Sequence, residues 1–336
     1  MTDQSRVEQP ELSYHVSLEH FEELGEEFST ALVGILNNAG LAQTLVSGLL
    51  QQLPDPDVWR LTISGDVVAT VNAIEQRDEG NAYTLDRGAG QVGARTINAH
   101  DGTYDIVIGA WSLMPAFDAS SVEELVEYMH SIGLHLVIHE AGHVVLHQRG
   151  EDSEAFQELA GGTETELVCR KHLAAHIDDF RIEKMTNRAA PSPLSQVDGL
   201  GDTLAHMRSE LTKANVLRFT DGENATFLSS TAVNDLVRVM TYLAAELSTT
   251  AQPGEVKKPS PLPDHWNIYV EDVWDVWVLT LNKLKPADEP MAVEEIADIL
   301  TELCAIVVEW MKNVVGYYVE INEDGTWTAY WNRSTY

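Results

Sequence analysis

The chain has 336 residues, 44% of them hydrophobic, which is enough for the buried core of one large or two ordinary domains. Its 53 acidic and 21 basic residues give a formal charge of −32, which would repel nucleic-acid backbones and anionic membrane surfaces, so we expect neither as a partner. With only two cysteines, Cys169 and Cys304, a disulfide framework or a cysteine-based zinc site is excluded. Any metal would need histidine and carboxylate ligands.

The N-terminal segment and the hydropathy pattern bear on location. Residues 1–10 lack the basic and apolar regions of a secretory signal. No uninterrupted apolar stretch approaches the length needed to cross a bilayer. We therefore expect a cytoplasmic protein, and the sequence does not indicate its oligomeric state.

Residues 1–150 are predicted to form an α+β subdomain. Apolar residues recur at helical spacing from 21 to 36 and from 41 to 53, which predicts two helices that end before Pro54. From Trp59 the pattern changes to period two, and β-branched segments are separated by glycines. Three or four strands are predicted within segments 59–74, 96–99 and 104–111, as a small antiparallel or mixed sheet.

Two short helices are predicted after this sheet. Ser121 precedes Glu124 by three residues, which is typical of a helix start and predicts a helix to about Ile132. Gly133 is predicted to break it, and a second helix should span residues 134–148.

Residues 151–336 are predicted to form a mainly helical subdomain. Thr163 could cap a long helix that runs to about Asn187, and a proline-rich loop should span 249–264. Three tryptophans at helical spacing indicate core packing: Trp266, Trp274 and Trp277. Alternating residues at 317–321 and 326–331 predict a terminal β-hairpin.

The strongest chemical signal is the sequence His139-Glu140-Ala141-Gly142-His143. On a helix, residues four apart share one face, so the two imidazoles could bind one metal ion. Glu140 lies one step around the helix, from where its carboxylate could act as general base toward a water molecule in the fourth coordination position. Because the flanking residues are apolar, the motif is expected on a helix buried beneath a cleft.

This pentapeptide and its apolar flanks resemble those of the zincin metallopeptidases, over about residues 96–187. The resemblance implies a zinc cofactor, a small sheet before the active-site helix, and a peptide or protein substrate. It also implies that the strand before the motif is the sheet edge along which an extended substrate pairs. We assign that role to the end of segment 104–111, namely Gly109, Ala110 and Trp111, although Trp111 could instead belong to the core.

A catalytic zinc site usually has a third protein ligand, and the long helix after the motif offers a polar stripe. Its members fall at intervals of four, three and four residues and so share one helix face: His172, His176, Asp179 and Glu183. Such a stripe could also be a polar helix face that is exposed to solvent and binds no metal.

In the gluzincin branch of the zincins, the third ligand lies on a downstream helix in an ExxxD pattern. This chain instead has DxxxE at 179–183, so the likeness is to that branch without a defined subfamily. It implies Asp179 as the third ligand and Glu183 as an acceptor of a hydrogen bond from a ligating imidazole. His176 is the nearest alternative.

Other third ligands stay open. Asp178 would sit around the helix from the stripe. Glu164 and Glu166 would apply if the repressor-cleaving peptidases, whose motif also continues into a Leu-His pair, are the better analogy. The family also commonly stabilises the oxyanion with a tyrosine or histidine. The sequence does not select among Tyr317, Tyr318, Tyr330, His206 and His265.

The sequence thus predicts a zinc-dependent hydrolase, with a peptide bond as the favoured target. Three alternatives remain: a metal-dependent enzyme that acts on a small molecule, a non-catalytic zincin-like protein with a binding or regulatory role, and an enzyme that uses iron or manganese at a His/His/carboxylate site for redox chemistry. The retained Glu140 favours an enzyme, because a purely structural site has no use for an uncoordinated carboxylate beside the water.

Overall fold

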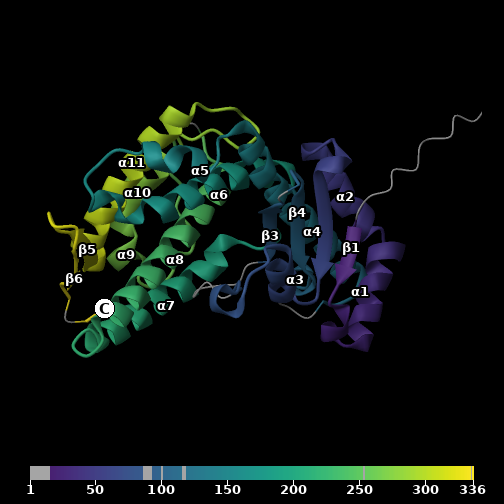
Figure 1. The fold of residues 1–336 in the computed structure, drawn as a ribbon, viewed down its shortest axis with the longest axis horizontal. Helices are drawn as coiled ribbons and strands as arrows, with labels where there is room; N and C mark the ends of the chain where they lie inside the picture. Colours follow the sequence, from purple (N-terminus) through teal and green to yellow (C-terminus); the bar gives the residue numbers. More distant parts are fainter. Residues whose placement is uncertain (1–15, 86–92, 100, 116–118, 253, 334) are drawn as a thin grey trace, which may run out of the picture.

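The computed structural model describes residues 16–85, 93–99, 101–115, 119–252, 254–333 and 335–336. It is an α+β protein with a small mixed sheet and a long helical C-terminal part, as predicted. In Figure 1 the sheet and the first helices lie on the right, and the C-terminal helices lie on the left. Helices α4 and α6 lie where the two parts meet, and their contact builds the site described below.

Among the described residues, the N-terminal part has four strands and four main helices. The strands are β1 (Val16–Glu19), β2 (Trp59–Ser64), β3 (Ala94–Asn98) and β4 (Tyr104–Gly109). The helices are α1 (Glu26–Asn38), α2 (Leu41–Gln52), α3 (Val67–Ile74) and α4 (Val122–Arg149). Helices α1 and α2 confirm the two helices predicted there. The predicted strand segment 59–74 is wrong in its second half, because Asp66 caps the Ala69 amide and starts helix α3.

The sheet has the order β1-β2-β4-β3. Strands β1, β2 and β4 are parallel, whereas β3 is antiparallel to β4 and forms one edge. Alternate residues of each strand face opposite sides. Ile106 and Ile108 pack with α2 and α4, while Val107 packs with Val71 of α3 on the other side. The sheet is therefore covered by α4 on one face and by α3 on the other.

This topology corrects the prediction that segment 104–111 is the sheet edge. Strand β4, which ends at Gly109, lies between β2 and β3. Ala110 and Trp111 belong to a short 3-10 helix that follows it. The strand that lies at the edge beside α4 is β3, which pairs with β4 alone in the described sheet.

Helix α4 is one continuous helix of 28 residues, so the predicted break at Gly133 is wrong. Gly133 serves packing instead. A Cβ atom there would lie 2.8 Å from Leu45 Cδ2, and one at Gly48 of α2 would lie 2.7 Å from Leu134 Cδ1. The two glycines let α2 and α4 approach closely, and the amide hydrogen bonds of α4 run on through that contact.

The C-terminal part contains a helical array and a terminal hairpin. Its longer helices are α6 (Arg170–Ala189), α7 (Gln196–Leu217), α8 (Gly222–Ser248), α10 (Glu271–Leu281) and α11 (Val293–Trp310); α5 (Ser153–Phe156) and α9 (Trp266–Tyr269) are short. Helix α6 starts seven residues later than predicted, because Thr163 instead caps the amide of Glu166 at the start of a separate 3-10 turn.

Two predictions for this part are confirmed. Strands β5 (Tyr317–Ile321) and β6 (Trp327–Trp331) form the terminal antiparallel hairpin. The tryptophans Trp266, Trp274 and Trp277 are at most 1% exposed and belong to the core.

Helix α6 contributes to two hydrophobic cores. Ile177 and Phe180 pack into the core of the C-terminal helices, whereas Ile182 and Met185 pack into the core formed by the sheet, α2 and α4. The helix is thus held from both sides.

No single helix in the described ranges has both the length and the apolar character to cross a membrane. Helices α1 and α2 meet that criterion together, by length and composition only, with a bend of 59° between them.

Candidate metal centre

Helix α4 presents the motif residues on one side while its other sides are buried. Val137, Ile138, Val144 and Leu146, which flank the motif, are at most 1% exposed. Within the motif, Gly142 faces α6, and a Cβ atom there would lie 2.7 Å from Ile182 Cγ2. The glycine therefore allows α6 to approach the motif helix closely.

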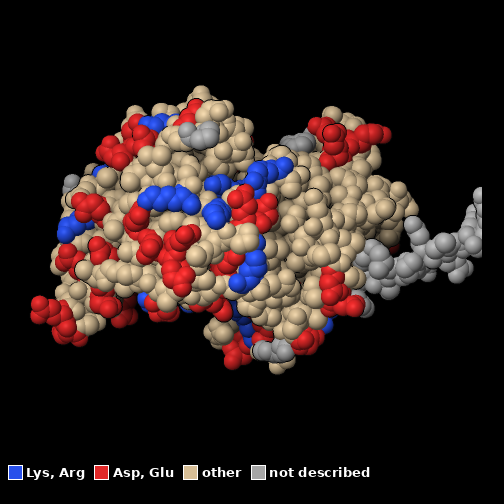
Figure 2. Space-filling view, turned by 90° about the horizontal axis from the view of Figure 1, so that it is seen from above, with Lys and Arg blue, Asp and Glu red and all other residues tan. Residues whose placement is uncertain are grey.

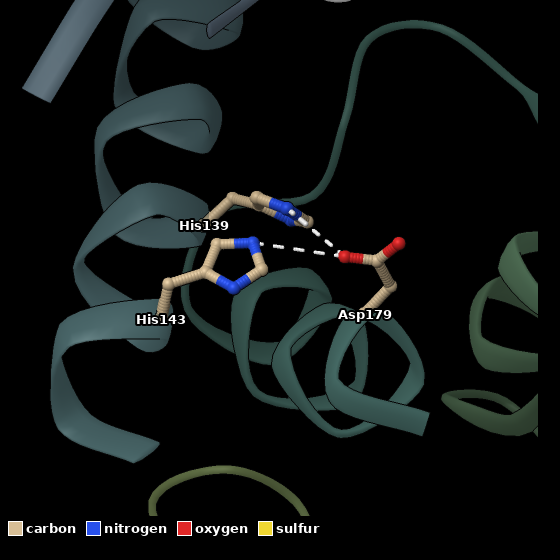
Figure 3. Close-up of side chains that lie close together, drawn as sticks. All are labelled: His139, His143 and Asp179. Carbon is tan, nitrogen blue, oxygen red and sulfur yellow. Dashed lines mark ion pairs between the residues drawn. The ribbon is translucent and has the colours of Figure 1, made fainter. Parts of the chain in front are cut away.

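That approach places Asp179 of α6 opposite the two motif histidines. Asp179 Oδ1 lies 3.6 Å from His143 Nε2 and 3.9 Å from His139 Nε2. Figure 3 shows the three side chains pointing toward one another, two from α4 and one from the facing helix. One ligand atom from each side chain lies within 4.8 Å of the others, and among the described residues this is the only such group of three.

The donor set fits zinc. Two imidazole nitrogens and one carboxylate oxygen are typical of catalytic zinc sites, which keep one further position for water. Ligand atoms about 2.0–2.2 Å from a tetrahedral ion are separated by about 3.3–3.5 Å, close to the observed distances. Neither Nε2 atom has a hydrogen-bond partner among the described residues, so both are available as donors to a metal.

Glu183 orients His139. The Nδ1–H of His139 donates to Glu183 Oε1 at 2.8 Å, which leaves Nε2 to face Asp179. Burial alone would lower the pKa of His139, but the hydrogen bond and charge of Glu183 outweigh it and raise that pKa to about 9, so a metal would bind Nε2 by displacing its proton. Burial would likewise raise the pKa of Glu183, yet hydrogen bonds from His135 and His139 hold it well below its usual range.

The second motif histidine stays neutral. Burial lowers the pKa of His143 to about 3, and the nearby charges of His139 and Arg95 add to this effect. A neutral imidazole is the form that binds metal ions. The His143 side chain is 33% exposed, so the site opens toward solvent on this side.

Glu140 is held by the edge strand. The Thr96 hydroxyl of β3 lies 2.7 Å from Glu140 Oε2 and can donate to it. Burial raises the pKa of Glu140, although the charge of His139 and the Thr96 hydrogen bond oppose the shift. A carboxylate with a raised pKa that faces a cleft is a suitable general base.

Tyr242 of α8 closes the site on the side of α6. Its hydroxyl is hydrogen-bonded to Asp179, and its ring stacks on that of His139 with 6.3 Å between centroids. Burial and the nearby carboxylates raise the pKa of Tyr242 well above its usual value, so the hydroxyl keeps its proton and donates to Asp179. Burial raises the pKa of Asp179 to about 6, while His139 and Tyr242 oppose that shift.

The motif residues, Asp179 and Tyr242 line one cleft of about 1230 Å³. Its walls come from β3, the end of α3, α4, α6 and α8. A peptide-sized ligand therefore has room beside the candidate ligands.

Asp179 differs from the other third-ligand candidates in its position relative to the motif histidines. His176 lines the cleft, but its Nε2 lies 3.0 Å from Asn234 Oδ1, and it does not join the group of three. Asp178 accepts a hydrogen bond from the Ser153 amide. Glu164 is exposed and Glu166 half-buried, and both precede α6 and lie outside the cleft. The geometry favours Asp179.

The oxyanion candidates lie elsewhere in the molecule. None of the five tyrosine and histidine candidates lines the cleft. The Tyr317 hydroxyl is hydrogen-bonded to that of Ser230, and His265 contacts Arg208. Gly109, Ala110 and Trp111 do not line it either, which removes them as a substrate strand.

Three residues of the site were not predicted. His135 lies four residues before His139, so helical spacing could have indicated it; its Nε2 lies 3.4 Å from Glu183 Oε1. Thr96 lay in a predicted strand, but no pattern indicates which strand faces the motif. Tyr242 lies on a helix remote in sequence and carries no local signal at all.

Comparisons of the chain with protein-family models, curated proteins and solved structures found no match.

Proposed function

We propose that this protein is a zinc-dependent hydrolase that cleaves peptide bonds, with a zincin-like arrangement of its active site. The observation that carries the proposal is the convergence of His139, His143 and Asp179 in a cleft that Glu140 also lines. Metal ligands alone would suit a structural site, whereas an uncoordinated buried carboxylate beside them suits hydrolysis.

His139, His143 and Asp179 would hold the metal. When bound there, zinc would lower the pKa of a water molecule and polarise the scissile carbonyl. Glu183 fixes the ring of His139, and Tyr242 fixes the carboxylate of Asp179. These contacts orient the ligands before the metal arrives, which favours a single coordination geometry.

Glu140 would move the proton. Its carboxylate, positioned by Thr96, would take a proton from the attacking water and deliver it to the nitrogen of the leaving amine. The buried setting that raises the pKa of Glu140 favours the first half of this transfer, the uptake of the proton from water.

The edge strand supports a peptide as the substrate. Strand β3 pairs only with β4 in the described sheet, and all its residues, 94–98, line the cleft beside the motif. An extended peptide could add to this edge through main-chain hydrogen bonds, which would bring its backbone next to Glu140.

The test compares the zinc-loaded protein with its Glu140→Gln variant on a library of quenched fluorogenic peptides. We expect the variant to bind zinc as the parent does and to lose about 10²- to 10⁴-fold in kcat/KM, the usual contribution of a general base. Zinc content is measured in parallel by elemental analysis.

Two results would contradict the proposal. A parent protein that binds zinc but cleaves no peptide would indicate a binding role or a small-molecule substrate. A protein that purifies with iron and little zinc would indicate different chemistry at the same ligands.

A further inference from the structure

Arginines gather at the cleft of this acidic chain. Four line it, Arg60, Arg77, Arg95 and Arg238, whereas no lysine of the described residues does. On the face shown in Figure 2, Asp and Glu side chains are scattered, and many Lys and Arg side chains lie toward its middle. Seven carboxylates line the same cleft, so its lining is not positive overall, and an acidic ligand would be attracted only by a guanidinium that these carboxylates leave without a close partner.

Most carboxylates of the cleft already have partners. Asp105 is bound by Arg60 at 2.7 Å, and Asp152 is bound by His147 at 2.6 Å. Glu140 and Asp179 belong to the candidate metal centre. Because Asp105 already pairs with Arg60, that guanidinium is not available to a ligand.

Arg95 is the cleft arginine with the weakest bonding. Its guanidinium lies 3.8 Å from Glu75, beyond hydrogen-bond distance, and its side chain is 45% exposed. Glu75 is instead bonded closely to Arg77. No described residue accepts a hydrogen bond from Arg95, so its N–H donors are available to a ligand carboxylate.

The strand geometry places Arg95 where a bound peptide would meet it. Arg95 precedes Thr96 on β3, and successive side chains of a strand point to opposite faces. Thr96 faces Glu140 and α4, so Arg95 faces the side of α3, as does Ile97. A peptide paired with β3 would place every second side chain on that face, and opposite charges across paired strands attract.

The cleft offers little to a large apolar side chain. The largest aliphatic residues among its described lining are Ile74 and Ile97, and the rest is polar, aromatic or alanine. Specificity at this face would therefore come from charge and hydrogen bonding.

We propose that the cleft binds an extended peptide that carries an aspartate or glutamate side chain next to Arg95, and that Arg95 determines this specificity. The inference depends on the proposed peptidase function, because it assumes a peptide along β3. It adds the substrate class: acidic peptide segments.

The experiment uses the full, zinc-loaded chain and fluorogenic octapeptides in which one position at a time is Glu, Gln or Lys. We expect, at one position, cleavage of the Glu peptide about tenfold better than that of its Gln counterpart, since a hydrogen bond to a charged group is worth about that factor. This ratio should fall as salt is added. Arg95→Gln should reduce it to about one.

Arg188→Gln is the matched control. Arg188 is similarly exposed, at 47%, and pairs with Asp288 outside the cleft. This variant should keep the parent ratio. Because each ratio compares two peptides on one variant, any effect of the lost charge on Glu140 cancels.

The outcomes separate the two proposals. Cleavage without a preference for Glu, or a preference that survives in Arg95→Gln, overturns the specificity inference and leaves the peptidase proposal standing. Cleavage of no peptide by the zinc-loaded parent overturns both.

Discussion

Helices α4 and α6 build the candidate metal centre together, but they differ in what holds them. The buried side chains of α4 are mostly apolar, with His135, His139 and Glu140 as its buried polar groups. Helix α6 buries five polar or charged side chains: His176, Asp178, Arg181, Glu183 and Thr186. The motif helix is thus fixed mainly by packing, whereas its partner depends also on the paired charges of Arg181 and Glu183.

The pairing on α6 is extensive on the side away from the cleft. Arg181 is fully buried and donates to Glu151 at 2.6 Å and to the carbonyl of Lys285 at 3.0 Å. Burying a charge is costly unless it is paired and hydrogen-bonded, so these contacts fix the rotation of α6 about its axis. That rotation is what aims Asp179 and Glu183 at the motif.

The largest expected effect concerns the ligand on α6. In Asp179→Asn the zinc affinity should fall by more than about 100-fold, since even an outer hydrogen-bond partner of a ligand contributes about 10- to 100-fold. His176→Gln, on the same helix face, should bind zinc almost as the parent does. Competition with a chromophoric chelator measures both affinities. The reverse ranking would identify His176 as the ligand.

A smaller effect is expected from the residue that orients His139. Glu183→Gln keeps the size of the side chain but removes its charge, so we expect zinc affinity to fall by about 10- to 100-fold. Glu166→Gln, at a half-buried position outside the cleft, is the control. Equal zinc affinities in the two variants, measured by the same competition, would show that Glu183 does not act on the site.

The contact between the two helices gives the third prediction. In Gly142→Ala the new methyl group would meet Ile182 Cγ2 at 2.7 Å and Met185 Cε at 3.1 Å. Overpacking of this kind costs about 1–3 kcal/mol in the free energy of unfolding. Because it pushes α6 away from α4, zinc affinity should also fall. Urea denaturation and zinc competition measure the two effects.

Two glycines serve as controls for this variant. Gly133→Ala crowds the contact of α4 with α2, so it should destabilise the fold without changing zinc affinity. Gly34→Ala has no atom within 4 Å and should stabilise helix α1 by about 0.5–1 kcal/mol. If Gly133→Ala weakened zinc binding as much as Gly142→Ala, the special role of the α4–α6 contact would be disproved.

The motif and the general class of the fold could be predicted because both depend on local patterns. Helical spacing suffices to place His139, Glu140 and His143 on one helix, and periodicity suffices for α1, α2 and the terminal hairpin. Gly133 was misinterpreted because a glycine inside a helix can mark either a break or a close contact. Only the position of Leu45 distinguishes the two.

The rest of the site depends on tertiary structure. The stripe on α6 contains both Asp179 and His176, and only the crossing of α6 over Gly142 brings Asp179 to the motif. The edge strand was assigned to 104–111 because sequence order suggested it, whereas strand order in space is β1-β2-β4-β3. Tyr242 reaches Asp179 from α8, and no spacing rule connects them.

The most direct test of the metal centre is an anomalous difference map at the zinc absorption edge, from crystals of the protein grown with zinc. We expect a single strong peak coordinated by His139 Nε2, His143 Nε2 and an Asp179 carboxylate oxygen, with Glu140 uncoordinated. No peak between the two histidines, or a peak whose third protein ligand is not Asp179, would contradict the account.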